Sequence, residues 1–140
     1  MVLNVSTDSK DKSSCTLLYD EAEQWLSTVW RGYVDALEAR NGALAYLDHA
    51  AQQHCALLLN DNSRLQGPWF DSIDWLMNMW VPRAERMGLR YVAHIIQNDR
   101  HDDTLTTQPP LHLPFDLQIF REVEDAKQWL RQCRVQLTQR

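Results

Sequence analysis

LLLNDNSRLQGPWFDSIDWLMNMW, residues 57–80, is the stretch that decides the predicted fold. An unbroken apolar run, residues 55–59, begins two residues before this stretch and extends into it. Such a run is typical of a strand covered on both faces in a parallel sheet. Residues 60–68 are rich in polar and turn-forming types and predict a loop. A helix is predicted after residue 70, and Asp71 or Ser72 can cap its free N–H groups. The stretch therefore predicts a buried strand, a polar loop and an aromatic helix that re-enters the core.

The residues before this stretch predict a tail, a hairpin and a helix. Residues 1–14 carry too few apolar side chains to repay the cost of ordering, so we expect a disordered tail. Runs 16–19 and 24–33 are strand-like and flank a turn-length gap, which indicates a β-hairpin. A helix is expected from residue 34 to about 53, where Gly42 either permits close packing or marks a bend. The predicted apolar face of this helix consists of Val34, Leu37, Leu44, Leu47 and Ala51.

The residues after it predict three more elements and a long connection. Pro82 cannot lie in a helix interior and fits the first turn of a second short helix, which Gly88 can close. Residues 89–97 read as a strand, 115–120 as an edge strand and 121–137 as an amphipathic helix, whereas 98–114 form a long polar loop. The predicted order is β-β-α-β-α-α-β-β-α. We expect one α/β domain over residues 15–137, with a sheet of about five mixed strands and no second domain.

Composition excludes several classes of function. The 140 residues carry a net charge of −5, without the basic stripe that nucleic-acid binding requires. No run of about 20 apolar residues occurs, which argues against an integral membrane segment, and residues 1–14 do not read as a secretory signal. Three cysteines without paired spacing favour reduced thiols and a cytoplasmic location. No metal-ligand spacing or phosphate-cradling loop is present, so no cofactor and no catalytic residues are predicted.

Short motifs extend from residue 16 to residue 133. They are, in order, Trp30-Arg31-Gly32-Tyr33, Leu59-Asn60-Asp61-Asn62, Gly67 with Trp69, Trp75 with Trp80-Val81-Pro82, Gly88, Val92-Ala93, and Phe120 with Ala126, Trp129 and Leu130. In their order and spacing the chain resembles the SpoIIAA-like or STAS-type family of small α/β domains. The resemblance is to the stand-alone bacterial branch, often called STAS or CRAL-TRIO-like.

The resemblance implies a regulatory or protein-interaction module that has no cofactor and performs no turnover. Anti-sigma antagonists of this family carry a phosphorylated serine in an Asp-Ser-Ser-Gly turn at a helix start. Here the matching residues are Asp71-Ser72-Ile73-Asp74, so the glycine is lost and Asp74 would repel a phosphate. The classical phosphorylation switch is therefore not expected.

Two sites of binding are predicted, and each has a structural alternative. The first is a partner surface at the end of the third strand, formed by Asp61, Asn62, Ser63, Arg64, Trp69, Asp71, Ser72, Trp75 and Trp80. Asn, Asp and Ser also satisfy their own backbone in ordinary turns, and Ser72 can act as a cap alone. The second is a tryptophan-lined pocket between the helix of Trp75 and Trp80 and the sheet, although indoles of this kind also simply fill cores. His94 is predicted to be a hydrogen-bonded core histidine.

The leading functional prediction is a non-catalytic interaction module that binds an unknown protein partner. The alternative is a carrier or sensor of a small apolar or lipid-like ligand, which requires a cavity under the aromatic helix. A homodimer is compatible with either. An enzyme ranks third, because no nucleophile with an adjacent base can be assembled from the chain.

Overall fold

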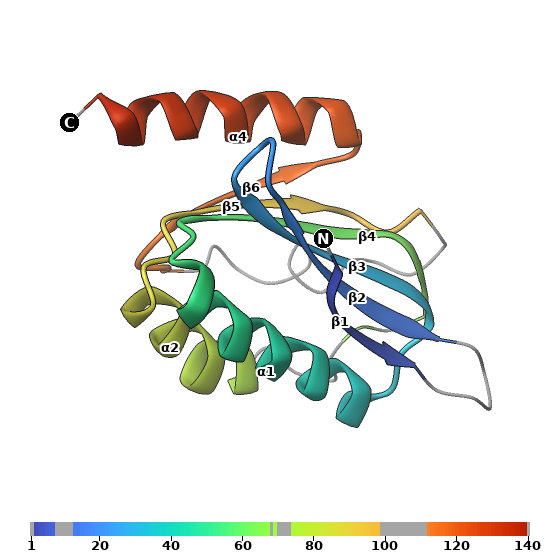
Figure 1. The fold of residues 1–140 in the computed structure, drawn as a ribbon. Helices are drawn as coiled ribbons and strands as arrows, with labels where there is room; N and C mark the ends of the chain where they lie inside the picture. Colours follow the sequence, from blue (N-terminus) through green and yellow to red (C-terminus); the bar gives the residue numbers. More distant parts are fainter. Residues whose placement is uncertain (1, 8–12, 68, 70–73, 99–111, 140) are drawn as a thin grey trace.

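The fold is α/β, a six-stranded mixed sheet with helices on both faces (Figure 1). A computed structural model describes residues 2–7, 13–67, 69, 74–98 and 112–139. The strands are β1 (Val2–Thr7), β2 (Ser14–Asp20), β3 (Trp25–Tyr33), β4 (Leu57–Gln66), β5 (Tyr91–Ile95) and β6 (Asp116–Phe120). The helical elements are α1 (Ala36–Gln53), the π-helical turn η1 (Leu76–Trp80), α2 (Val81–Arg86) and α4 (Val123–Thr138).

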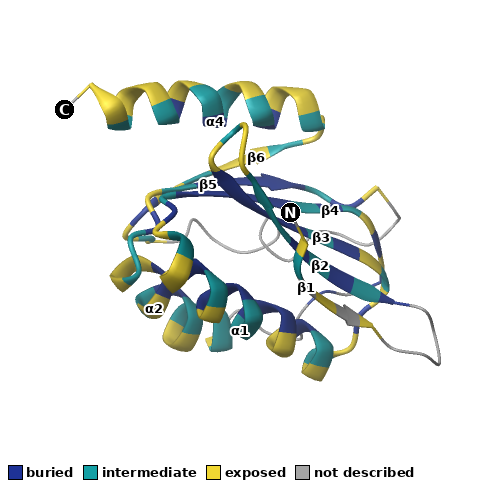
Figure 2. Ribbon diagram, viewed as in Figure 1, coloured by how far each residue is buried: buried dark blue, intermediate teal, exposed yellow. Residues whose placement is uncertain are grey.

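The strands follow one another in the sheet in the order of the sequence. β1, β2 and β3 form an antiparallel meander, whereas β3, β4, β5 and β6 run parallel. Helices α1 and α2, which lie in the parallel crossovers β3–β4 and β4–β5, cover one face, and α4, which follows the last strand, covers the other (Figure 1). Burial is concentrated in the sheet and on the helix faces that meet it (Figure 2). The predicted hairpin, the α/β class and the edge position of β6 are confirmed.

The predicted tail over residues 1–14 is wrong for Val2–Thr7, which form β1 and raise the strand count from about five to six. β1 pairs with β2 along its whole length, from Val2 opposite Leu18 to Thr7 opposite Ser14. An edge strand is held mainly by backbone hydrogen bonds, so few of its side chains need burial. Val2 and Val5 are indeed more than half exposed. A composition-based prediction of disorder cannot detect such a strand.

The loop predicted over residues 60–68 is also wrong, because β4 continues through Gln66. Two asparagines lie within this strand, and both are buried. Asn is depleted in strands because its side chain normally competes for backbone hydrogen bonds. Here the Asn60 and Asn62 side chains bond to each other instead, at 3.1 Å from Nδ2 to Oδ1. The polar residues therefore lie inside the sheet and not in a turn after it.

Helix α1 is confirmed, but its buried face differs from the predicted one. Leu37 is 68% exposed, and only Leu47 of the predicted stripe is among the buried helical residues. The buried face is built largely from small residues, with Gly42 at its centre. A Cβ built on Gly42 would lie 2.6 Å from Cη2 of Trp30 and 3.0 Å from Sγ of Cys15. Gly42 is thus a close-packing position, where the helix lies directly on a tryptophan of the sheet.

The aromatic helix takes a π-helical turn ahead of Pro82, where the sequence predicts that one helix gives way to another. Val81 donates its backbone N–H to the Leu76 carbonyl oxygen, five residues earlier, which is the π-helical pattern. Proline has no N–H and its ring clashes with the carbonyl four residues before it in a regular helix. The wider π turn accommodates this clash, and the chain continues into α2 without a break.

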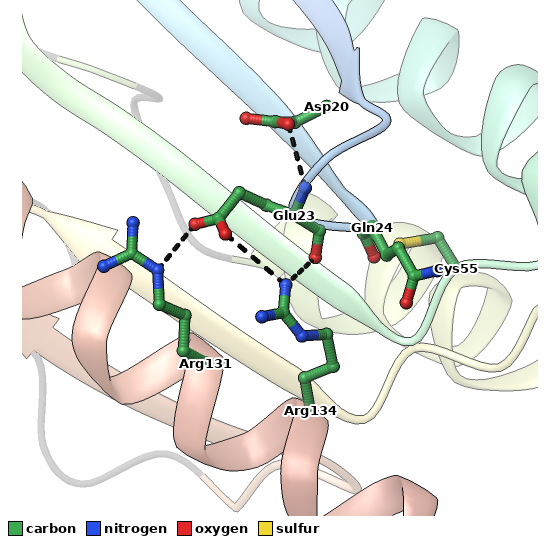
Figure 3. A network of polar contacts seen from close by, with 6 residues as sticks. All are labelled: Asp20, Glu23, Gln24, Cys55, Arg131 and Arg134. Carbon is green, nitrogen blue, oxygen red and sulfur yellow. Dashed lines mark hydrogen bonds and ion pairs between the residues drawn. The ribbon is translucent and has the colours of Figure 1, made fainter.

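Helix α4 covers the other face of the sheet and is tied to the β2–β3 turn (Figure 3). Its predicted apolar stripe is confirmed by the burial of Ala126, Leu130 and Cys133. Glu23 in the turn accepts a hydrogen bond from Nε of Arg131 at 2.7 Å. Arg134 donates to the Glu23 backbone carbonyl. These contacts fix the C-terminal half of α4 over the start of β3.

We predict that Gly42→Ala destabilises the fold. Helix propensity alone would favour alanine by up to about 1 kcal/mol. Overpacking against Trp30 and Cys15 is expected to cost about 1–3 kcal/mol and should dominate. Urea denaturation measures the difference, and Asn41→Ala, at the exposed neighbouring position, is the matched control that should leave stability equal or higher. An increase in stability for Gly42→Ala would contradict the close contact.

Candidate functional site

A cavity of about 80 Å³ lies between the sheet and the helical layer of α1, η1 and α2. Strands β3, β4, β5 and β6 each contribute lining residues, and the helices close it from the opposite side. Its walls are almost entirely apolar, and half of the six tryptophans of the chain reach it: Trp30, Trp69 and Trp80. This is the position predicted for a tryptophan-lined pocket.

The aromatic rings around the cavity form two contact groups, one around Trp69 and one around Trp80. Trp30 meets Trp69 edge to face, with ring centroids 5.6 Å apart. Trp69 stacks on His94, at 5.9 Å and an interplanar angle of 24°. On the helical side, Trp80 lies 5.4 Å from Tyr46 and donates its indole N–H to the Ala43 carbonyl oxygen at 3.0 Å. The Trp80 ring is thereby anchored to α1.

The polar part of the site is a buried network centred on the side-chain amide of Asn60 in β4. Its Oδ1 accepts from Oγ1 of Thr28 at 2.5 Å and from Nε1 of Trp30 at 2.9 Å. Its Nδ2 donates to Oδ1 of Asn62 at 3.1 Å and lies 2.9 Å from Nδ1 of His94. All four hydrogen-bonding positions of this amide are therefore occupied.

The network also fixes the tautomer of His94. An indole nitrogen can only donate, so the Asn60 atom that faces Trp30 must be the oxygen. The amide nitrogen then faces His94, whose Nδ1 has to accept. His94 therefore carries its ring hydrogen on Nε2. At 1% exposure it is the hydrogen-bonded core histidine that the sequence predicts, which confirms that prediction.

Asn62 continues the network along β4 but does not line the cavity. Its side chain is fully buried, and its Nδ2 finds no hydrogen-bond partner among the described residues. Asn62 lies where the β3–β4 pairing shifts register, between the pairs of Val29 and Arg31. It also lies past Asp61, the last β4 residue paired with β5.

The structure brings some of the predicted site residues together and separates others. Trp69 is buried and shares the cavity with Trp80. Trp75 is half-buried, and the Arg40 guanidinium lies 5.8 Å from its ring centroid. The remaining residues divide between β4 and positions that the structure does not describe. Asp61 and Ser63 are half-buried, Asn62 is buried and Arg64 is exposed in β4, whereas Asp71 and Ser72 lie outside the described residues.

Sequence reasoning did not select Thr28, Asn60 or His94 as site residues. Each is a polar residue within an apolar strand, and such residues are informative because burial requires them to be paired. Thr28 and Asn60 lie on adjacent parallel strands and are register partners, as are Asn60 and His94. Their common face could be inferred only with the strand order known.

The three cysteines are free and buried. Burial raises the pKa of the Cys15 thiol to about 12 and that of Cys133 to about 11. Burial also raises the pKa of Cys55, whose Sγ donates to the Leu57 carbonyl oxygen at 3.2 Å. Since the thiolate is the reactive species, none of them is activated as a nucleophile.

Two further properties concern only the described part of the chain. None of its helices is both long and apolar enough to cross a membrane. No three of its His, Cys, Asp or Glu side chains come close enough together to hold a metal ion.

Comparisons with protein-family models, curated proteins and solved structures found no match to this chain.

We predict that Asn60→Leu destabilises the protein by about 3 kcal/mol, because it leaves the Trp30 N–H and its other partners buried and unpaired. Thr28→Val, which removes one donor while Trp30 still bonds to Asn60, should cost only about 1 kcal/mol. Denaturant unfolding measures both variants. Equal losses for the two would argue against a network centred on the Asn60 amide.

We predict a contribution of Cys15 to alkaline unfolding. In the unfolded chain its thiol ionises near the ordinary pKa of 9.0, whereas in the folded protein it stays protonated up to about 12. Below pH 9 its contribution is therefore complete, and it is lost as the pH rises from about 9 to about 12. Denaturant titrations across this range measure the free energy of unfolding, which should fall less steeply with pH in Cys15→Ala than in wild type. The two slopes should differ by up to about 1.4 kcal/mol per pH unit. Parallel profiles for the two proteins would contradict this contribution.

Proposed function

We propose that this protein is a non-catalytic carrier or sensor that binds a small, mainly apolar molecule in the cavity under the aromatic helix. The observation that carries the proposal is the cavity itself, walled by Trp30, Trp69 and Trp80. Protein interiors are packed densely and leave few voids larger than a water molecule. An apolar cavity with a fixed polar network on one side has the composition of small-molecule sites.

The position of the cavity agrees with this role. His94 lies towards the carboxyl end of β5, with Asn60 of β4 as its register partner, and ligands of open α/β sheets bind near the carboxyl ends of strands. The helical wall includes Leu76 and Met77 of η1, which are only half-buried. π-helical turns occur frequently at functional sites, and the irregular hydrogen bonding of η1 makes this the wall best able to move.

A role in protein interaction through the predicted partner surface has less support. Two of its residues, Asn62 and Trp69, are buried and cannot contact a partner without rearrangement. Arg64 is exposed and remains available to a partner. Membership of the STAS-type family likewise remains part of the proposal, supported by the α/β class and the mixed sheet. The absence of turnover is proposed because the thiols are buried and their pKa values are raised.

Binding should be detectable through the tryptophans that line the cavity. We expect one equivalent of a small apolar compound to change the tryptophan fluorescence in a screen of organic compounds and lipids. Mass spectrometry of organic extracts from the purified protein identifies any molecule retained from the cell. Val92→Met, which places a longer side chain into the cavity, should weaken binding by at least about ten-fold.

Val29→Met is the matched control for this experiment. Val29 lies between Thr28 and Trp30, which both line the cavity, so its side chain points to the opposite face of the sheet. Binding should be unchanged in this variant. A compound that binds wild type and Val92→Met equally well occupies a different site, and a screen without any bound compound would count against the proposed function.

A further inference from the structure

We infer that the cavity selects a compact, uncharged and apolar ligand, such as a small arene, and recognises it mainly by shape and aromatic contact. This inference rests on the proposed function and specifies the class of ligand. It follows from how the polar groups around the cavity are already used.

The central polar residue has no hydrogen-bonding capacity left for a ligand. The Asn60 amide can accept two hydrogen bonds and donate two, and Thr28, Trp30, Asn62 and His94 occupy these positions. A ligand carbonyl or carboxylate would have to displace one of these buried partners. Such an exchange leaves the displaced group unpaired, which opposes binding.

Three donors of the cavity wall, on Trp30, Thr28 and Trp80, are also engaged. The Trp30 indole N–H and the Thr28 hydroxyl hydrogen both point to Asn60. The Trp80 indole N–H is bound to the Ala43 carbonyl oxygen. The amide nitrogen of Asn62, which has no acceptor among the described residues, belongs to a residue outside the cavity wall.

Within the described part of the chain, no charged side chain lines the cavity to compensate a charged ligand. Among the described residues that line the cavity there is no Lys, Arg, Asp or Glu. Burying an unpaired carboxylate or ammonium group in such surroundings is strongly unfavourable. Fatty acids and other charged metabolites are therefore excluded as fully enclosed guests.

The size of the cavity sets the second limit. At about 80 Å³ it is smaller than the roughly 150 Å³ apolar cavity that is known to accept benzene or xenon. A single xenon atom needs little adjustment, whereas an arene requires a small displacement of the half-buried η1 wall. An extended lipid chain would require far more space than the helical layer provides.

The inference is tested on the full-length protein with four probes: xenon, toluene, benzyl alcohol and benzoate. Methyl NMR spectra report binding at the cavity through Leu58, Val81 and Val92, which line it. We expect xenon and toluene to shift these resonances and benzoate to bind at least about 100-fold more weakly than toluene. Val81→Ala enlarges the cavity and should strengthen toluene binding, whereas Val92→Met should abolish it and Val29→Met should preserve it.

Each other outcome is decisive. Binding of benzoate or benzyl alcohol at these methyl groups without binding of toluene would overturn the inference and leave the proposed function intact. If none of the four probes shifts the methyl resonances of wild type or of Val81→Ala, the inference is also overturned. The proposed function is overturned with it only if the fluorescence screen finds no ligand. Val81→Ala keeps the test informative even where Val92→Met fails to fold.

Discussion

The buried side-chain amide of Asn60 connects three neighbouring strands of the sheet. It bonds to Thr28 and Trp30 on β3 and to His94 on β5. These hydrogen bonds fix the orientation of the polar side chains on the face of the sheet that packs against α1. A buried amide is tolerated only when its hydrogen bonds are complete, and here they are. The same bonds orient the Trp30 indole, on which the helical layer packs. The position of α1 therefore depends on a polar contact inside the sheet.

Packing between the layers follows from a large residue on one side and a small one on the other. Trp30 projects from β3, and α1 approaches it closely because Gly42 has no side chain. Further along, α1 holds the Trp80 indole through a backbone carbonyl, and η1 takes a π-helical turn ahead of Pro82. The cavity lies between these two layers.

Much of the fold and less of the site could be predicted from the sequence. The hairpin, the helices and the covered strand could be predicted because hydrophobic periodicity and turn-forming residues are properties of short stretches of sequence. β1 was missed because an edge strand needs few buried side chains, and the second half of β4 was missed because it pairs with β3 across more than thirty residues of chain. A cavity lies where the tryptophan-lined pocket was predicted, under the aromatic helix. Two residues of the predicted partner surface, Asn62 and Trp69, are buried, which the local sequence does not indicate.

The α/β class, the order of most elements and the presence of an aromatic helix with Pro82 in the first turn of the next helix follow from the local sequence. These depend on residue periodicity, on proline geometry and on composition, which act over a few neighbouring residues. Only the tertiary structure decided which polar residues meet, because Thr28, Asn60 and His94 become neighbours through parallel pairing across more than thirty residues of chain. In the paired strands, neighbouring side chains occupy all four hydrogen-bonding positions of the Asn60 amide. The apolar character of the cavity is consequently a property of the assembled sheet.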